Sequence, residues 1–311
     1  MASAAFALNN LRGVLLPITT PFSSERIDHD ALRVNVDRWA TTGIAGYVVL
    51  GSTGERVHLN EREYLDVIET TRGLVPQSMA FIVGAGHQST HTTINEVRRA
   101  SEAGADAVLV ITPSFYRSAI SQEILFAHYT AVADAVPVPV LLYSMPALTG
   151  IKIEPETVAR LSEHPNIIGV KDSSNDIAEF KRTVDLCPAE FAVMTGNGTV
   201  FLDALEAGAA GAILAVGCVV PELCVEIFRS FNAGERERAR TLQNRLTPLA
   251  TAVTTRFGIG GLKAALDLAG YRGGEVRAPL RAADESARKE IAALLDDCRG
   301  GTPWPPPFAS N

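Results

Sequence analysis

The stretch IIGVKDSSNDIAEFKRTVDL, residues 167–186, contains the unit from which the fold is built. It begins with the apolar run Ile167–Val170, and a polar turn then leads into an amphipathic segment long enough for a helix. The apolar run lacks the alternation of a half-exposed strand, which is typical of a parallel strand covered on both faces. The stretch therefore predicts one strand–helix unit of an α/β fold.

The same unit recurs along the chain. Seven further apolar runs begin near Val14, Tyr47, Phe81, Ala107, Val138, Phe191 and Ala212. By subtraction, consecutive runs start 21 to 34 residues apart, which suits a strand followed by a helix. Glycines at Gly43, Gly104 and Gly208 are expected to end helices just before the next strand. Because eight such units close a barrel, the predicted fold class is α/β, a (β/α)8 TIM barrel.

Beyond about Pro221 the strand-like runs end and only helical patterning remains. We therefore expect residues 1–220 to form the barrel and residues 221–311 to form a C-terminal helical extension packed on it. The segments with helical patterning are Glu222–Asn232, Glu235–Thr254, Gly261–Ala269 and Asp284–Cys298. The Pro-rich segment Gly300–Pro307 is expected to be an extended arm or to stay mobile, because proline cannot continue a helix.

Composition argues against several classes of function. The 311 residues include 28 Lys and Arg against 35 Asp and Glu, a formal net charge of −7, and the basic residues are mixed with acidic ones. Nucleic-acid binding requires clustered positive charge, so it is not expected. The chain shows no basic and apolar leader, no membrane-length apolar stretch and no C-x-x-C pair among its four cysteines. We therefore expect a cytoplasmic protein with reduced thiols and no membrane segment.

Lys171 is the most informative residue at a predicted strand end, because the carboxyl ends of the strands form the active face of such barrels. It is the only lysine that directly follows a buried-strand run. Partial burial favours the neutral amine, the form that attacks carbonyl groups. From position alone, a lysine paired with a carboxylate at the barrel rim is an equally good interpretation.

Tyr143 favours the catalytic interpretation. It lies at the equivalent point of the preceding predicted strand, so its hydroxyl group and the Lys171 amine should meet in one pocket, where a phenol can shuttle protons. The turn Gly51-Ser52-Thr53-Gly54 ends an earlier strand, and its N–H groups and two hydroxyls can bind a small carboxylate. An amine, a proton relay and a carboxylate cradle together predict a Schiff base with a 2-oxo acid such as pyruvate.

Other chemistries of barrel enzymes are less well supported. A metal hydrolase needs His and carboxylate ligands at strand ends, yet only His87 lies near one. We expect His87 and His91 to face solvent or to cap a helix, because the loop offers no acidic partner. For pyridoxal phosphate, Gly196-Asn197-Gly198 is the sole candidate phosphate loop, and Gly84-Ala85-Gly86 lacks the third glycine of a dinucleotide site.

Four motifs, in order along nearly the whole chain, resemble the class I pyruvate-dependent aldolases, the family of dihydrodipicolinate synthase and N-acetylneuraminate lyase. The motifs are Gly51-Ser52-Thr53-Gly54-Glu55, Tyr143-Ser144-Met145-Pro146, Gly169-Val170-Lys171-Asp172-Ser173, and Phe257-Gly258-Ile259 with Gly261-Leu262-Lys263. The resemblance implies a homotetramer built as a dimer of dimers, with neither metal nor organic cofactor.

The resemblance also assigns roles to individual residues. Lys171 would be the Schiff-base lysine, Tyr143 the general acid and base, and Ser52 a proton relay. Thr53, with its backbone amide, would hold the pyruvyl carboxylate. The other substrate-binding residues would be Gly51, Gly196, Ile213 and Leu148. The third relay residue of the family is a tyrosine from a neighbouring subunit, and Tyr116 is assigned this role, with Phe115 as the alternative at that position.

Departures from the family pattern bear on the substrate. Where the dihydrodipicolinate synthases have an arginine that binds the carboxylate of the aldehyde, this chain has Leu148. Where the sialate lyases carry an acidic pair, it has Gly198-Thr199. Stretches such as Arg256-Phe257-Gly258-Ile259 are similar to the 4-hydroxy-2-oxoglutarate aldolases and the related 2-keto-3-deoxy-sugar-acid aldolases.

The expected activity is that of a Schiff-base-forming lyase that reversibly cleaves a 4-hydroxy-2-oxo acid to pyruvate and an aldehyde. The first alternative is dihydrodipicolinate synthase (4-hydroxy-tetrahydrodipicolinate synthase), which condenses pyruvate with aspartate semialdehyde and is disfavoured by Leu148. A hydratase that forms the same imine but expels water stays open. A sensor or scaffold that binds 2-oxo acids without turnover is a further alternative, against which Lys171 and Tyr143 together argue.

Overall fold

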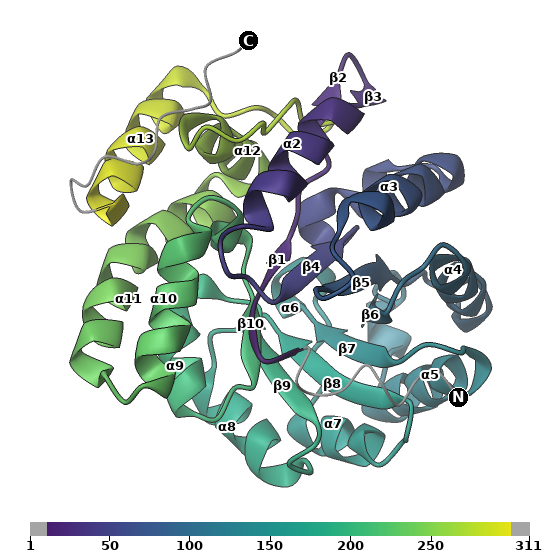
Figure 1. The fold of residues 1–311 in the computed structure, drawn as a ribbon. Helices are drawn as coiled ribbons and strands as arrows, with labels where there is room; N and C mark the ends of the chain where they lie inside the picture. The colour runs from purple at the N-terminus through teal and green to yellow at the C-terminus, as the bar shows by residue number, and fades with distance from the viewer. Residues whose placement is uncertain (1–10, 300–311) are drawn as a thin grey trace.

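The structure is a computed structural model that describes residues 11–299, and eight parallel strands form a closed barrel at its centre (Figure 1). The barrel strands are β1 (Gly13–Pro17), β4 (Gly46–Val49), β5 (Ala80–Ala85), β6 (Ala107–Ile111), β7 (Val140–Ser144), β8 (Ile167–Asp172), β9 (Ala192–Thr195) and β10 (Gly211–Ile213). Neighbours pair in chain order, and β1 closes the barrel by pairing with β10. The predicted (β/α)8 barrel is confirmed, with each strand starting within two residues of its predicted start.

Side chains on the barrel strands alternate between two apolar clusters. On β7, Leu141 and Tyr143 join the cluster inside the barrel, whereas Val140 and Leu142 join the larger cluster between the strands and the helices. Because both faces are covered by apolar side chains, the strands appear in the sequence as continuous apolar runs. The same alternation places Tyr143 inside the barrel.

Within residues 11–299 a helix follows each barrel strand and contributes to an outer ring (Figure 1). The ring helices are α2 (His29–Trp39), α3 (Glu61–Leu74), α4 (Thr90–Glu102), α5 (Gln122–Ala135), α7 (Pro155–Ser162), α8 (Ile177–Leu186), α9 (Phe201–Glu206) and α10 (Pro221–Asn232). A capping box of Asn60 and Glu63 begins α3. Gly43, Gly104 and Gly208 have positive φ angles after α2, α4 and α9, which confirms the predicted helix ends.

The last helices gather on one side of the barrel, at the left and top of Figure 1. α10 contacts β1 and α9, and the boundary expected at residue 220 lies directly before it. The helices α11 (Arg236–Thr251), α12 (Gly258–Leu268) and α13 (Glu285–Arg299) follow, with the π-helical turn η6 (Ala252–Arg256) between the first two. The helical patterning predicted for this region is confirmed, whereas Gly300–Pro307 lies outside the described residues.

Short elements occupy the loops at the carboxyl ends of the strands. They are the hairpin of β2 (Phe22–Ser23) and β3 (Arg26–Ile27), the turns η1 (Ser52–Gly54), η2 (Arg56–His58), η3 (Arg117–Ala119), η4 (Gly198–Val200) and η5 (Ala215–Cys218), and the helix α6 (Pro146–Thr149). Because the strands are parallel, these loops meet at one end of the barrel. This end carries the polar residues on which the sequence-based predictions depend.

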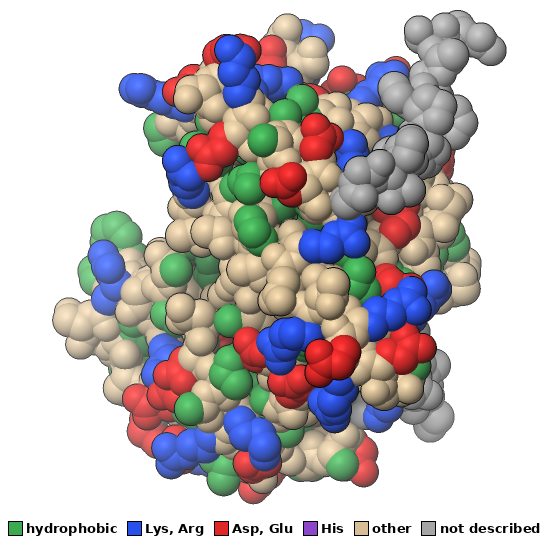
Figure 2. Space-filling model, turned by 90° about the vertical axis from the view of Figure 1, so that its left-hand side faces the viewer, with side chains coloured by type: hydrophobic (Ala, Val, Ile, Leu, Met, Phe, Trp, Pro, Cys, Tyr) green, Lys and Arg blue, Asp and Glu red, His purple; other side chains and the backbone are tan. Residues whose placement is uncertain are grey.

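The surface shows no segregation of charge on the face formed by the left-hand side of Figure 1, where Figure 2 shows Lys and Arg interspersed with Asp and Glu. No helix in the described part of the chain is long and apolar enough to cross a membrane. The four cysteines are free thiols, as their spacing predicted, and Cys218, Cys224 and Cys298 are buried.

Candidate active site

Lys171 and Tyr143 lie side by side at the carboxyl ends of adjacent strands. Lys171 on β8 is in register with Tyr143 on β7, and both side chains are buried. The Lys171 Nζ atom lies 4.4 Å from the centre of the Tyr143 ring. The predicted convergence of the two side chains is therefore confirmed, and it follows directly from the pairing of neighbouring parallel strands.

The amine of Lys171 is buried and has no acidic partner in the described part of the chain. No carboxylate within residues 11–299 forms an ion pair with it, so the structure does not support a rim lysine held by an acid. The buried thiol of Cys218 is a neighbour, and burial raises the pKa of that thiol, which keeps it neutral. A buried amine without a counter-ion is suited to nucleophilic attack on a carbonyl group.

The turn η1 brings a hydroxyl group to Tyr143. Ser52 Oγ lies 3.0 Å from the Tyr143 hydroxyl oxygen, a hydrogen bond that links the two predicted relay residues. The backbone before the turn is strained, because Leu50 has a φ of 57°, in the left-handed region. Gly84 allows this backbone to approach β5, since a Cβ atom at Gly84 would lie 2.2 Å from Leu50 O. Thr53 is buried in the same turn.

Gly196 and Ile213, two further residues of the predicted site, lie beside Lys171 or inside the barrel. A Cβ atom on Gly196 would lie 2.5 Å from Lys171 Cε and 2.0 Å from Ser173 Oγ, so a side chain at this position would displace the lysine. Ile213 is fully buried and belongs to the same interior cluster as Tyr143. Gly196 thus lies against Lys171, and Ile213 lies inside the barrel that carries it.

The other predicted site residues are exposed to solvent. Leu148 in α6 is 64% exposed, and Phe115 and Tyr116, after β6, are 74% and 70% exposed. The two aromatic rings contact each other edge to face. Gln88 Oε1 accepts hydrogen bonds from the backbone N–H groups of Ser114 and Phe115, at 2.8 and 2.7 Å, which fixes this loop against the one after β5.

His87 and His91 are both exposed, as the sequence predicted. His87 also has an acidic partner that the sequence did not indicate, because its Nε2 atom lies 3.1 Å from Glu96 Oε1. The acid comes from α4 rather than from the loop, and it also binds Arg56 and the Gly86 N–H group. His91 is exposed and contacts Asn95. Among the described residues no three His, Cys, Asp or Glu side chains are grouped so as to hold a metal ion.

Glu55 and Lys263 belong to two of the four sequence motifs, but the sequence predicted no role for either residue. In the structure they form a buried ion pair, with Lys263 Nζ 2.6 Å from Glu55 Oε1. The available signal was Lys263 itself, a charged residue between Leu262 and Ala264 on the buried part of a mainly apolar helix. Its partner could not be identified, because residues that far apart in the sequence have no common pattern.

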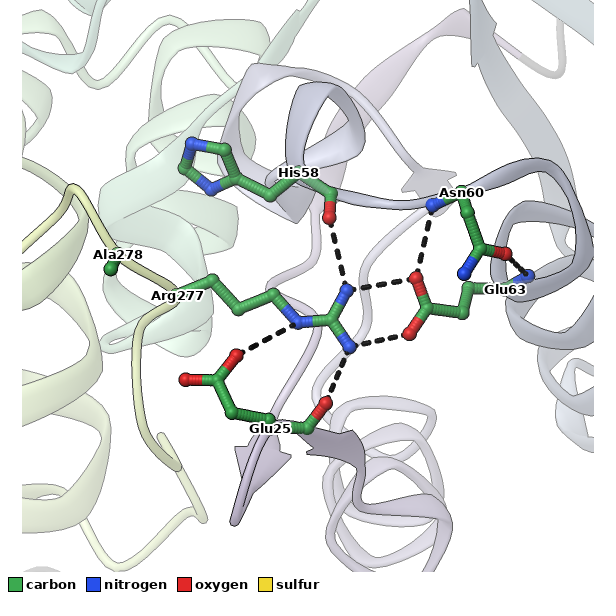
Figure 3. Close-up of a pocket in the computed structure, with 6 residues that line it drawn as sticks. All are labelled: Glu25, His58, Asn60, Glu63, Arg277 and Ala278. Atoms are coloured by element: carbon green, nitrogen blue, oxygen red, sulfur yellow. Dashed lines mark hydrogen bonds and ion pairs between the residues drawn. The ribbon is translucent and has the colours of Figure 1, made fainter.

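A shallow pocket lies outside the barrel end, and none of the predicted site residues lines it (Figure 3). Arg277 crosses it, with both terminal nitrogens bound to the Glu63 carboxylate and one of them to Glu25 O. The hydrogen bond from Arg277 lowers the pKa of Glu63. These pairs tie the segment around Arg277 to α3 and to the β2–β3 hairpin.

Comparison with known proteins identifies one family. The model of the dihydrodipicolinate synthetase family matches residues 10–298. The chain is 35% identical over 286 residues to the 4-hydroxy-tetrahydrodipicolinate synthase of Syntrophus aciditrophicus (strain SB), which covers 92% of this chain and 98% of the relative.

Solved structures show the same similarity. A monomeric variant of dihydrodipicolinate synthase has a TM-score of 0.90 at 32% identity, covering 94% of this chain and 98% of that chain. YagE, a prophage protein of the dihydrodipicolinic acid synthase family from E. coli K12 solved in complex with pyruvate, has a TM-score of 0.87 at 27% identity, covering 93% and 98%. The similarity extends over nearly the full length of each protein.

Proposed function

Because the chain belongs to the dihydrodipicolinate synthetase family and is a lyase of the pyruvate-dependent aldolase type, we propose that Lys171 forms a Schiff base with the 2-oxo group of its substrate. The observation that carries this proposal is the buried amine without an acidic partner, placed against a tyrosine that is hydrogen-bonded to Ser52. The pyruvate complex of YagE is a property of that relative and supports the same choice of ligand.

The proposed reaction is the reversible cleavage of a 4-hydroxy-2-oxo acid to pyruvate and an aldehyde. The Lys171 amine attacks C2, the oxygen leaves as water, and the protonated imine takes up the electrons of the C3–C4 bond as it breaks. Tyr143 accepts the proton of the C4 hydroxyl group and exchanges it with Ser52. The enamine is then protonated at C3, and water hydrolyses the imine to release pyruvate and the free amine.

The remaining assignments complete the site. Thr53 and Gly51 hold the carboxylate through N–H and hydroxyl groups, while Gly196 and Ile213 shape the pocket beside the lysine. Tyr116 extends the proton relay from a neighbouring subunit of a homotetramer built as a dimer of dimers. The exposed position of Tyr116 in the single chain supports a role in a second subunit.

A cation next to Gly150, two residues after Leu148, bears on how the part of the substrate beyond the pyruvyl group is recognised. Arg117 reaches the loop after α6, where a Cβ atom on Gly150 would lie 2.8 Å from its Nη1 atom. Within residues 11–299 the guanidinium group of Arg117 has no hydrogen-bond or ion-pair partner, whereas Lys152 binds Glu179 at 2.5 Å. An available cation suits a substrate with a second carboxylate. We therefore infer that 4-hydroxy-2-oxoglutarate is preferred over 2-keto-3-deoxy sugar acids.

A second candidate function is the condensation of pyruvate with aspartate semialdehyde. This function is favoured by the similarity of the chain to known synthases, since the Syntrophus protein and the monomeric variant are both synthases of this type. The two candidates share the imine on Lys171 and differ in the second substrate. Leu148, at the position of the synthase arginine, favours the cleavage reaction.

Intact-protein mass spectrometry after incubation with pyruvate and borohydride tests the Schiff base. We expect an adduct on the wild type and on Lys152→Ala, a surface control, and none on Lys171→Ala. Tyr143→Phe should keep the adduct while turnover falls about 10²- to 10⁴-fold, the usual contribution of a general acid–base group. Full activity of Lys171→Ala, or a wild type without adduct, would contradict the proposal.

Initial rates separate the two candidate reactions. A higher kcat/KM for pyruvate release from 4-hydroxy-2-oxoglutarate than for condensation of pyruvate with aspartate semialdehyde is expected. The opposite order would assign the chain to the synthases while leaving the Schiff base on Lys171 intact.

A further inference from the structure

A buried ion pair connects the turn next to Tyr143 with the C-terminal helices. Glu55 directly follows η1, and Lys263 lies in α12. Their side chains are 1% and 2% exposed, and Lys263 Nζ lies 2.6 Å from Glu55 Oε1. Neither side chain takes part in the reaction derived above, so the pair needs an explanation of its own.

The Nζ atom of Lys263 makes three contacts close to the turn. Besides Glu55, its Nζ atom donates to Thr20 O at 2.8 Å and to Glu275 O at 2.5 Å. Thr20 Oγ1 in turn donates to Gly54 O at 2.8 Å. The ammonium group thus donates two hydrogen bonds to backbone carbonyl groups and forms an ion pair with Glu55, and two of these three contacts lead back to the turn.

Glu55 connects the same turn to the segment after α12. Its second carboxylate oxygen, Oε2, accepts from Arg277 N and lies near His58 Nδ1, each at 3.2 Å. The Arg277 side chain fixes this segment to Glu63 and Glu25, as Figure 3 shows. The segment is thus attached at both its backbone and its side chain.

The turn is not stable by its own backbone geometry. Leu50 before it and Glu55 after it have φ angles of 57° and 54°, and such left-handed conformations are unfavourable for residues other than glycine. Surrounding contacts must therefore fix the conformation in which Ser52 Oγ reaches the Tyr143 hydroxyl group. Glu55 and Lys263 supply buried charged contacts at this point, beside those of the adjacent Arg56 with Glu96.

We propose that Glu55 and Lys263 are positioning residues that set the geometry of the Ser52–Thr53 turn for substrate binding and proton transfer. The inference rests on the proposed function, because the turn is the carboxylate cradle of that reaction. A buried ion pair is weak evidence for a role in stability, since apolar pairs of similar volume often stabilise a fold as well. The C-terminal extension would then act on the reaction through Lys263 and its contact with Glu55.

The test compares Glu55→Gln, Lys263→Met and the double variant by thermal unfolding, kcat, KM and the rate of the pyruvate–borohydride adduct. Each single variant should unfold at a lower temperature, because it leaves one buried charge unpaired. The double variant should recover the unfolding temperature, yet its kcat/KM should remain about 10- to 100-fold below the wild type, the cost of a displaced binding group. Lys181→Met with Asp185→Asn, an exposed pair, is the control and should change neither quantity.

A double variant with recovered unfolding temperature and wild-type kcat/KM would overturn the inference and leave the pair a purely structural one. If the double variant does not fold, Glu55→Asp decides, because it keeps the charge and shortens its reach by one methylene. Lower kcat/KM in folded Glu55→Asp supports positioning, and wild-type kcat/KM refutes it. Failure of the proposed function itself is distinguishable, because the wild type would then form no pyruvate adduct.

Discussion

The two buried lysines differ in what surrounds them. Lys263 contacts a carboxylate and donates to two backbone carbonyl groups, and these contacts partly offset the burial that lowers its pKa. Lys171 contacts a tyrosine ring, and no carboxylate within the described range pairs with it. A nucleophilic amine needs a free electron pair, so the missing counter-ion, rather than burial, separates the candidate nucleophile from a structural lysine.

Arg117→Gln tests the recognition of a second carboxylate. A lost charge-assisted hydrogen bond costs about 1.5–3 kcal/mol, so kcat/KM for 4-hydroxy-2-oxoglutarate should fall about 10- to 100-fold. The value for a 2-keto-3-deoxy sugar acid, whose distal end is uncharged, should hardly change. Steady-state rates with both substrates check this, with Lys289→Gln on α13 as an exposed control. An equal loss with both substrates would mean that Arg117 does not recognise the distal carboxylate.

Residue-level predictions succeeded where two residues share a regular relationship. Tyr143 and Lys171 occupy equivalent points of adjacent parallel strands, and that relationship can be derived from the order of the strands. The pairs Glu55–Lys263 and His87–Glu96 join different kinds of element, and their partners depend on how loops and helices pack. No periodicity in the sequence reports such packing.

The length of a helix or strand decided whether it could be predicted from the sequence. Barrel strands and ring helices bury long apolar runs or stripes, and these leave a clear period in the sequence. The hairpin β2–β3, the turn η1 and the helix α6 contain two to four residues each, too few for a period. These short elements shape the candidate site, so its detailed geometry had to come from the structure.

Helix α5 should make stability depend on pH through His128. Burial lowers the pKa of His128 from 6.5 to about 4, and its Nδ1 atom lies 2.9 Å from Thr90 Oγ1. Between these two values the unfolded chain binds a proton that the native state does not. The contribution of His128 to the free energy of unfolding is therefore fully present above pH 6.5, and it is lost as the pH falls toward about 4.

Urea unfolding of the wild type and His128→Gln near pH 7 and pH 5 measures this contribution. The wild type should lose about 2 kcal/mol more than the variant over that interval. His91→Gln, an exposed histidine on the neighbouring helix α4, should behave as the wild type. Equal losses in the wild type and His128→Gln would show that His128 is protonated in the native state.

At the scale of the whole molecule, the single chain leaves part of the proposed proton relay outside its own barrel. Phe115 and Tyr116 are exposed at the end of the barrel that carries Lys171, on a loop fixed by Gln88. A relative of the same fold is a monomeric variant, so assembly must be established for this chain directly. The proposal that Tyr116 acts in a neighbouring subunit therefore needs a test that distinguishes subunits.

Mixing two inactive variants provides that test. Lys171→Ala and Tyr116→Phe should each be nearly inactive alone, but a mixed dimer contains one site with Lys171 from one subunit and Tyr116 from the other. After co-expression and random assembly, activity should return to roughly a quarter of the wild type, because two-fold symmetry exchanges the loops reciprocally. Lys171→Ala mixed with Tyr143→Phe is the control and should stay inactive, because both residues come from adjacent strands of one barrel. Sedimentation of each mixture verifies assembly, and an assembled first mixture without activity would place Tyr116 in its own barrel or outside the relay.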